Sequence, residues 1–158
     1  MAKNGFSMSN RGQVPLTIED AYTVKVIDCG KLIVLNDGTN GLVLTLPSCA
    51  DAGAGWNCDI LVQDSAASGK TYKISTAGAV TSVSDYYVGG LAMVSANSTA
   101  ECLFVASDGN SNDHINLLYN TQGGLAGSHI NLITDGTVWF VKGALHCDGV
   151  IATPFSDT

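Results

Sequence analysis

Short apolar segments follow one another along most of the chain and predict a succession of β-strands. Residues 22–28 alternate apolar and polar side chains at the two-residue period of a half-buried strand. No segment of ten or more residues shows the 3.6-residue period of an amphipathic helix. The further strand-like segments are 31–35, 42–46, 58–63, 71–75, 79–83, 91–96, 101–107, 114–119, 130–134, 138–142 and 144–147. Short strands at regular spacing predict an all-β fold, an antiparallel β-sandwich or jelly-roll-like barrel.

Turn residues separate these segments and predict hairpins. Asp-Gly begins at Asp37, Asp108, Asp135 and Asp148, and this dipeptide is a strong short-range hairpin signal because glycine and aspartate tolerate positive φ. The segment 71–75 is expected to pair with 58–63 as a hairpin across the small residues between them.

The first twenty residues lack the strand pattern. Gly5, Gly12 and Pro15 would interrupt any regular element there. We therefore expect residues 1–20 to form an extended N-terminal arm, with a frayed terminus as the alternative. Residues 21–158 are expected to form a single β-sandwich domain.

Composition narrows the class of protein. Of the 158 residues, 13% are charged and 46% are hydrophobic, whereas a typical soluble domain carries about 25% charged residues. A disordered chain would need higher charge and lower hydrophobicity. A helical bundle would be rich in alanine, glutamate, lysine and leucine. The net charge of −7 and the lack of a basic patch argue against a nucleic-acid partner. A surface with few charges suits a contact role better than chemistry.

The N-terminal sequence and the five cysteines indicate the cellular compartment in which the protein is made. Neither a signal peptide nor a membrane-spanning segment is expected from the sequence, so we expect synthesis in a reducing cytoplasm and no membrane partner. The five cysteines lack the paired spacing of a zinc site. We expect them to be buried, reduced thiols, with a disulfide framework as the alternative.

Motifs for catalysis or cofactor binding are absent from the sequence. It has no nucleophile elbow, no phosphate-binding loop and no His-Glu-x-x-His motif. Only two glutamates occur, which limits the paired carboxylates of a glycosidase. Residues 108–113 are rich in side-chain oxygen ligands, like a calcium-binding loop, but they lack the EF-hand spacing and its closing glutamate. A simple turn is therefore favoured. The prediction is therefore no catalytic residue, no cofactor and no metal. A hydrolase, or a metal or pH-sensing histidine cluster including His146, stays an alternative.

One small repeat predicts an interface. His114-Ile115-Asn116-Leu117-Leu118 recurs as His129-Ile130-Asn131-Leu132-Ile133. In a strand, the histidine and asparagine of each copy share one face and the first two apolar residues share the other. The candidate oligomer-interface residues are therefore His114, Asn116, His129 and Asn131, with chance similarity as the alternative. Trp56 and Trp139 are expected in the core rather than on a sugar-binding platform.

Three consecutive segments carry a resemblance to a known family. Residues 30–36, 42–47 (ending in Thr-Leu-Pro) and 55–62 resemble a β module of tailed-phage structural proteins. Similar modules occur in head decoration (cement) proteins and in some fibre or spike domains. The resemblance implies a β-sandwich or jelly-roll-like subunit, often trimeric, that sits outside a capsid and clamps neighbouring shell subunits. It transfers no catalytic residue.

The functional expectation is a phage capsid decoration protein. It would bind the major capsid protein non-covalently as a symmetric oligomer, expected to be a homotrimer, on the exterior of the virion after assembly in the host cytoplasm. The arm supplies the candidate capsid contacts Lys3, Phe6, Met8 and Arg11. A virion fibre or spike domain and a carbohydrate-binding module are the alternatives.

Overall fold

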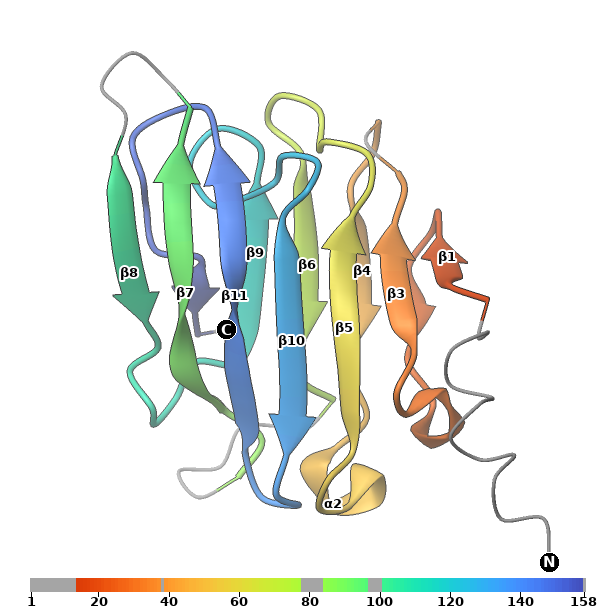
Figure 1. Ribbon diagram of the computed structural model, residues 1–158. Helices are drawn as coiled ribbons and strands as arrows, with labels where there is room; N and C mark the ends of the chain where they lie inside the picture. The colour runs from red at the N-terminus through yellow and green to blue at the C-terminus, as the bar shows by residue number, and fades with distance from the viewer. Residues whose placement is uncertain (1–13, 38, 78–83, 97–100, 158) are drawn as a thin grey trace, which may run out of the picture.

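The computed structural model describes residues 14–37, 39–77, 84–96 and 101–157. Two β-sheets lie one behind the other, as Figure 1 shows. Sheet A has seven strands in the order β1-β3-β5-β10-β11-β7-β8, and sheet B has five in the order β12-β9-β6-β4-β2. The prediction of an all-β sandwich is confirmed; a closed barrel is not.

The strands and short helices have the following bounds. Sheet A contains β1 (Leu16–Ile18), β3 (Leu32–Leu35), β5 (Asn57–Val62), β7 (Tyr87–Ser95), β8 (Cys102–Ala106), β10 (His129–Thr134) and β11 (Trp139–Cys147). Sheet B contains β2 (Tyr22–Thr23), β4 (Leu42–Thr45), β6 (Thr71–Ser75), β9 (His114–Leu118) and β12 (Phe155–Ser156). The helices are the 3-10 turn η1 (Val26–Asp28) and α2 (Cys49–Ala52).

The first half of the chain winds back and forth between the two sheets. Successive strands from β1 to β6 alternate between sheet A and sheet B, so β1, β3 and β5 run parallel to one another. In the same way β2, β4 and β6 run parallel in sheet B. The second half adds antiparallel neighbours, including the hairpin of β10 and β11, and the parallel pair β7 and β11.

Because of this winding, the observed strand pairing differs from the antiparallel pairing that the sequence predicted. Among the described strands, five of the ten pairs are parallel rather than antiparallel. The predicted hairpin of β5 with β6 is wrong, because the loop between them crosses from one sheet to the other. Of the four Asp-Gly sites, the one at Asp135 joins two strands that pair with each other, β10 and β11. Asp37 and Asp108 lie in loops that join the two sheets.

Several expected boundaries also change. Leu16–Ile18 forms β1 and pairs with β3, so these three residues of the predicted arm 1–20 belong to sheet A. Residues 1–13 of that arm lie outside the described residues. The predicted strand 22–28 is β2 followed by η1, in which the Asp28 carboxylate accepts hydrogen bonds from the Lys31 ammonium (2.8 Å) and the Lys25 backbone N–H (2.9 Å). The two predicted strands at 138–147 are one strand, β11. The predicted strand 79–83 lies outside the described residues.

The core fills the space between the sheets. In β5, inward side chains are buried and outward ones partly exposed in strict alternation. Trp139 is fully buried and meets Trp56 edge to face, with ring centroids 5.4 Å apart, so the prediction that both tryptophans belong to the core is confirmed. Tyr72 and Tyr87 are also fully buried, and their hydroxyls donate to the carbonyls of Asp64 and Ile74.

The cysteines match the prediction only in part. All five are free thiols, and Cys49, Cys58 and Cys147 are buried. Burial raises the pKa of the Cys49 thiol to about 12, which keeps it protonated and unreactive. Cys29 and Cys102 are exposed, against the prediction. Cys102 is exposed because β8 is an edge strand.

Candidate binding surface

Rows of cross-strand side chains make up the outer face of sheet A, and two neighbouring rows cross every strand from β3 to β8. Cross-strand partners share a face of a sheet, so the strand register gives the members of each row. One row runs Val34, Leu61, His129, Ala144, Ala92 and Phe104 from β3 to β8. The next row runs Leu32, Asp59, Asn131, Lys142, Gly90 and Ala106. In these two rows polar side chains occupy the middle and apolar ones the flanks.

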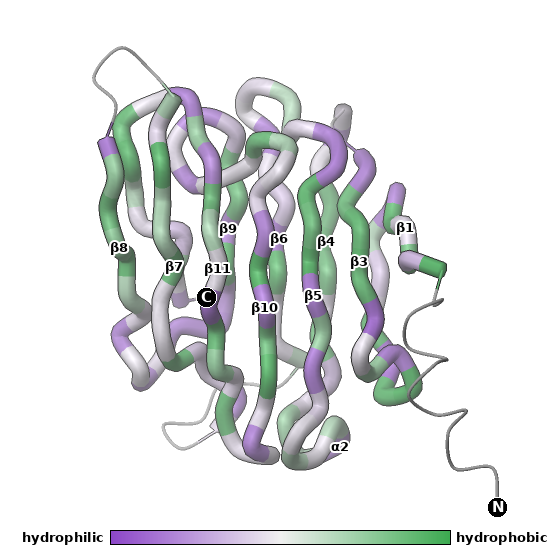
Figure 2. Tube along the Cα trace, viewed as in Figure 1, coloured by the Kyte–Doolittle hydropathy of each residue, from purple (hydrophilic) through white to green (hydrophobic). Residues whose placement is uncertain are grey.

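The apolar part of this face is exposed to solvent. Phe104 on β8 is 73% exposed, Phe140 on β11 is 42% exposed and Ile133 on β10 is 41% exposed. Ile133 and Phe140 are cross-strand partners, and Val94 on β7 is exposed as well. Figure 2 views the molecule from this side and shows apolar residues along β7, β8 and β11. Exposed apolar side chains gathered on one face are typical of an interaction surface, whereas scattered ones are ordinary.

A polar cluster lies beside these apolar residues. The Asp59 carboxylate accepts a hydrogen bond from the Asn131 amide (2.9 Å), and the His129 Nε2 lies 3.2 Å from the same oxygen. Lys142 is the cross-strand neighbour of Asn131. Fixed donors and acceptors at the middle of an apolar face can orient a partner, while the apolar contacts supply affinity.

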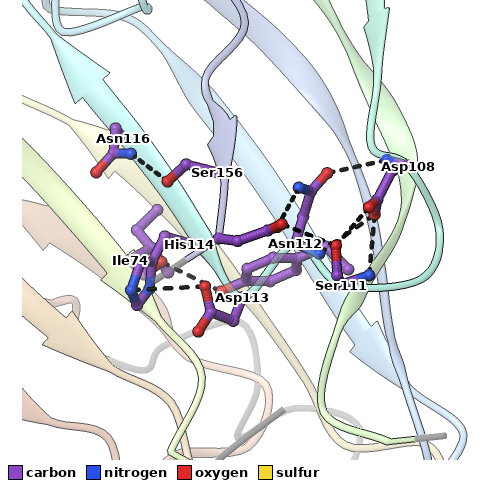
Figure 3. Close-up of polar contacts among 10 residues, drawn as sticks. Ile74, Asp108, Ser111, Asn112, Asp113, His114, Asn116 and Ser156 are labelled. Carbon is purple, nitrogen blue, oxygen red and sulfur yellow. Dashed lines mark hydrogen bonds and ion pairs between the residues drawn. The ribbon is translucent and has the colours of Figure 1, made fainter. Parts of the chain in front are cut away.

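The outer face of sheet B has a different character. Its central row is Thr23, Thr45, Ser75, His114 and Ser156. The neighbouring row contains Val43, Lys73 and Asn116, and the Asn116 amide donates to the Ser156 hydroxyl at 2.8 Å, as Figure 3 shows. Thr45 and Lys73 on this polar face are partly exposed, whereas Ser75 and His114 are buried.

The four predicted oligomer-interface residues divide between the two sheets. His114 and Asn116 lie on β9 in sheet B, while His129 and Asn131 lie on β10 in sheet A. Both strands direct their isoleucine and first leucine into the shared core, as the repeat predicts. The histidines and asparagines therefore lie on opposite outer sides of the sandwich and do not form one surface. Whether either pair contacts another copy stays a prediction.

His114 is nearly buried, unlike His129. It is 7% exposed, and its Nε2 lies 3.5 Å from the Asp113 carboxylate, as Figure 3 shows. Among the described residues, neither ring nitrogen has a hydrogen-bond partner. Burial lowers the pKa of His114 below its ordinary value of 6.5, and the Asp113 carboxylate offsets only part of that effect. The nearby Lys73 ammonium lowers the pKa further.

Acidification is therefore expected to destabilise the folded protein through His114. Between the lowered folded pKa and 6.5, the unfolded chain binds a proton at this residue that the folded chain does not. The free energy of unfolding should thus fall as the pH drops below about 6.5. Urea titrations between pH 7.5 and 5 measure this slope, and His114→Gln should flatten it. An unchanged slope in that variant would assign the pH dependence to other groups.

The loop after β8 is a turn held by its own side chains. The Asp108 carboxylate accepts backbone N–H bonds from Asn110 (3.0 Å) and Ser111 (3.0 Å), and a hydroxyl bond from Ser111 at 2.6 Å. These bonds lower the pKa of Asp108, the Ser111 hydroxyl most of all. Within the described ranges, no group of three or more histidine, cysteine, aspartate or glutamate residues could hold a metal ion. The interpretation of residues 108–113 as a turn is confirmed.

A hollow of about 420 Å³ lies beside β1. Its lining, residues 16–22, includes the carboxylates of Glu19 and Asp20. Asn36 donates to the Glu19 carboxylate at 3.3 Å. The lining contains no histidine, cysteine or lysine that could act as a base or nucleophile beside these acids. Tyr22 is the other titratable side chain of this lining. The expectation of a protein without catalysis stays a prediction.

Sequence reasoning missed the apolar outer face of sheet A. The sequence pattern of β7 and β8 carried this information, because apolar residues occupy both odd and even positions there instead of alternating with polar ones. Such a run indicates a strand covered on both faces, yet the structure leaves the outer face of β8 open. The predicted capsid contacts Lys3, Phe6, Met8 and Arg11 lie outside the described residues.

Among the described residues, no helix is long and apolar enough to cross a bilayer. No protein-family model, curated protein or solved structure matches the chain.

Proposed function

We propose that this protein is a non-catalytic binding protein that attaches to a protein shell through the outer face of sheet A. The observation that carries the proposal is the contrast between the two outer faces. Sheet A presents Phe104, Phe140 and Ile133 around a polar cluster, whereas the described part of sheet B presents mainly hydroxyl and amide groups. The outer face of sheet A is thus the more apolar of the two outer faces and the better suited to a protein partner.

The shell that we propose is the exterior of a phage capsid, with the major capsid protein as partner. The resemblance of residues 30–62 to a module of head decoration proteins supports this choice. In the structure these residues form β3, β4 and β5, two sheet A strands joined through one sheet B strand. Symmetric repetition of a shell allows modest affinity at each site to add up to stable attachment. The homotrimer and the location on the virion surface belong to the same proposal.

Buried tryptophans weigh against the carbohydrate-binding alternative. Trp56 and Trp139 are 3% and 0% exposed, so neither ring can stack on a sugar, and the exposed aromatic rings of sheet A are those of Phe104 and Phe140. A fibre or spike domain would use the same fold at another place on the particle. Co-sedimentation with purified heads and with purified tails distinguishes the two locations.

The binding face is tested by a matched pair of substitutions. The double variant Ile133→Ser and Phe140→Ser should weaken shell binding at least about tenfold, because truncating buried apolar anchors commonly costs more than 1 kcal/mol each. Val43→Ser is the control, since Val43 is 42% exposed and lies on the outer face of sheet B. Co-sedimentation at a series of protein concentrations gives both affinities. Equal losses in the two variants would contradict the proposed face.

A further inference from the structure

The edge strands of the sandwich differ in their protection against pairing with other chains. β1, β2 and β12 are only two or three residues long. Pro15 precedes β1, Lys25 lies two residues after β2, and Asp157 follows β12. Short length, proline and charge are means by which proteins prevent edge-to-edge association. The fourth edge strand, β8, is longer, and its five residues, Cys-Leu-Phe-Val-Ala, include neither a proline nor a charge. Its flanking charges are Glu101, directly before it, and Asp108, two residues after it.

The backbone of β8 leaves one set of polar groups free at the edge. Ser95 N–H donates to the Glu101 carbonyl (2.9 Å) at one end of β8, and Ser107 N–H donates to the Gly89 carbonyl (3.0 Å) at the other. The odd-numbered residues of β8 therefore direct their N–H and C=O groups toward β7, and the even-numbered residues direct theirs away from it. No described residue pairs with that outer edge. The residues with outward backbone groups are Cys102, Phe104 and Ala106.

The side chains leave this edge accessible. Cys102, Phe104 and Ala106 are exposed, and their register places them on the outer face of sheet A. Phe104 lies over Gly90 of β7, where an added Cβ would come within 2.6 Å of its ring. Since the ring extends back across β7, it does not cover the open edge.

We propose that β8 pairs antiparallel with β8 of a second copy of this chain about a twofold axis. Complete overlap of the outward backbone groups places Phe104 opposite Phe104 and Cys102 opposite Ala106, and forms about six hydrogen bonds between the copies. A second copy fits this edge because the strand is complementary to itself. In this register Glu101 lies opposite the neutral Ser107, so the two glutamates do not meet.

The pairing joins two copies of sheet A into one continuous sheet. Their apolar outer faces then lie side by side and form a single larger face. The inference is independent of the proposed function, because it concerns the edge of sheet A and its test needs no shell. It predicts even-numbered assemblies, either a dimer or a pair of trimers.

A designed disulfide tests the register. In a Cys29→Ser background, Ala106→Cys places a thiol opposite Cys102 of the other copy, at a Cα separation of about 5.5 Å that a disulfide can span. Ala144→Cys is the control, because Ala144 is exposed on the same face but two strands away from the edge. Mild oxidation with diamide should give a covalent dimer at least ten times faster with Ala106→Cys than with Ala144→Cys. Equal rates would overturn the proposed pairing.

A proline variant tests the backbone bonds. Ala106→Pro removes an outward N–H and spares the hydrogen bonds to β7, a position at which edge strands tolerate proline. Sedimentation velocity should show self-association of the wild type and a dissociation constant at least tenfold higher for Ala106→Pro. Phe104→Lys, which places a charge at the same edge, should have the same effect. A wild type that stays monomeric at several hundred micromolar, or an unchanged constant in both variants, would overturn the inference.

Discussion

Trp139→Ala should lower the free energy of unfolding by about 3–5 kcal/mol. Trp139 is the largest of the fully buried side chains of the described core and begins β11, which pairs with both β10 and β7. Its removal leaves a cavity between the sheets and deprives Trp56 of its edge-to-face partner. Domains of this kind are stable by only about 5–15 kcal/mol, so the loss is a large share of the total.

Urea denaturation followed by far-ultraviolet circular dichroism measures this loss. Phe140→Ala is the matched control, because Phe140 is the next residue of the same strand but points to the outer face and is 42% exposed. Its effect on stability should be below about 1 kcal/mol. Similar losses in the two variants would contradict the assignment of the inner and outer faces of β11.

Gly89→Ala is expected to cost about 2–5 kcal/mol, the sum of backbone strain and a steric clash. Gly89 has φ of +117° inside β7, a conformation that residues with a Cβ rarely adopt. An added Cβ would also collide with the backbone carbonyl of Val141, the residue that faces Gly89 on β11. The pair of β7 and β11 is the central parallel contact of the second half of the chain, so this clash would disturb sheet A as a whole.

Gly109→Ala separates the two contributions. Gly109 has φ of +70° but has open space where a Cβ would be placed. Its substitution should therefore cost only the backbone strain, about 1–2 kcal/mol. Thermal unfolding of both variants gives the comparison. If Gly109→Ala proves as costly as Gly89→Ala, the close approach of β7 to the Val141 carbonyl does not contribute to the cost.

The alternation of apolar residues was sufficient to predict the strands but not the sheets. In β5 and β9 the pattern identified the buried side chains, because a strand directs alternate residues to opposite faces. The same pattern contains no information on which strand lies next. The loop between β5 and β6 was therefore interpreted as a hairpin, although it crosses from one sheet to the other. Likewise, Asp37 begins an Asp-Gly pair that is typical of a hairpin turn, but it lies in the loop that leads from β3 in sheet A to β4 in sheet B.

The candidate surface was harder to predict for a related reason. Ile133 on β10 and Phe140 on β11 come five and six strands after Leu61 on β5 in sequence order. Only the register of sheet A places them on one face. Continuous apolar residues in β7 and β8 were compatible with a strand buried on both sides. The His-Ile-Asn-Leu repeat correctly indicated which side chains point outward. It could not indicate that its two copies belong to opposite sheets.

The parallel winding of the first half has a consequence for binding. Because β1 to β6 alternate between the sheets, each layer is held to the other by several crossings as well as by the core. A face held in this way is preorganised, so little conformational entropy is lost when a partner binds. We therefore expect the same backbone in the free and the bound protein.

Co-sedimentation of the protein with intact phage heads tests the central proposal most directly. The wild type and Val43→Ser should bind with the same affinity and saturate at a fixed ratio to shell subunits. The double variant Ile133→Ser and Phe140→Ser should remain folded and lose at least about nine-tenths of its affinity. Heads that bind none of these proteins, or all three equally well, would contradict attachment through the outer face of sheet A.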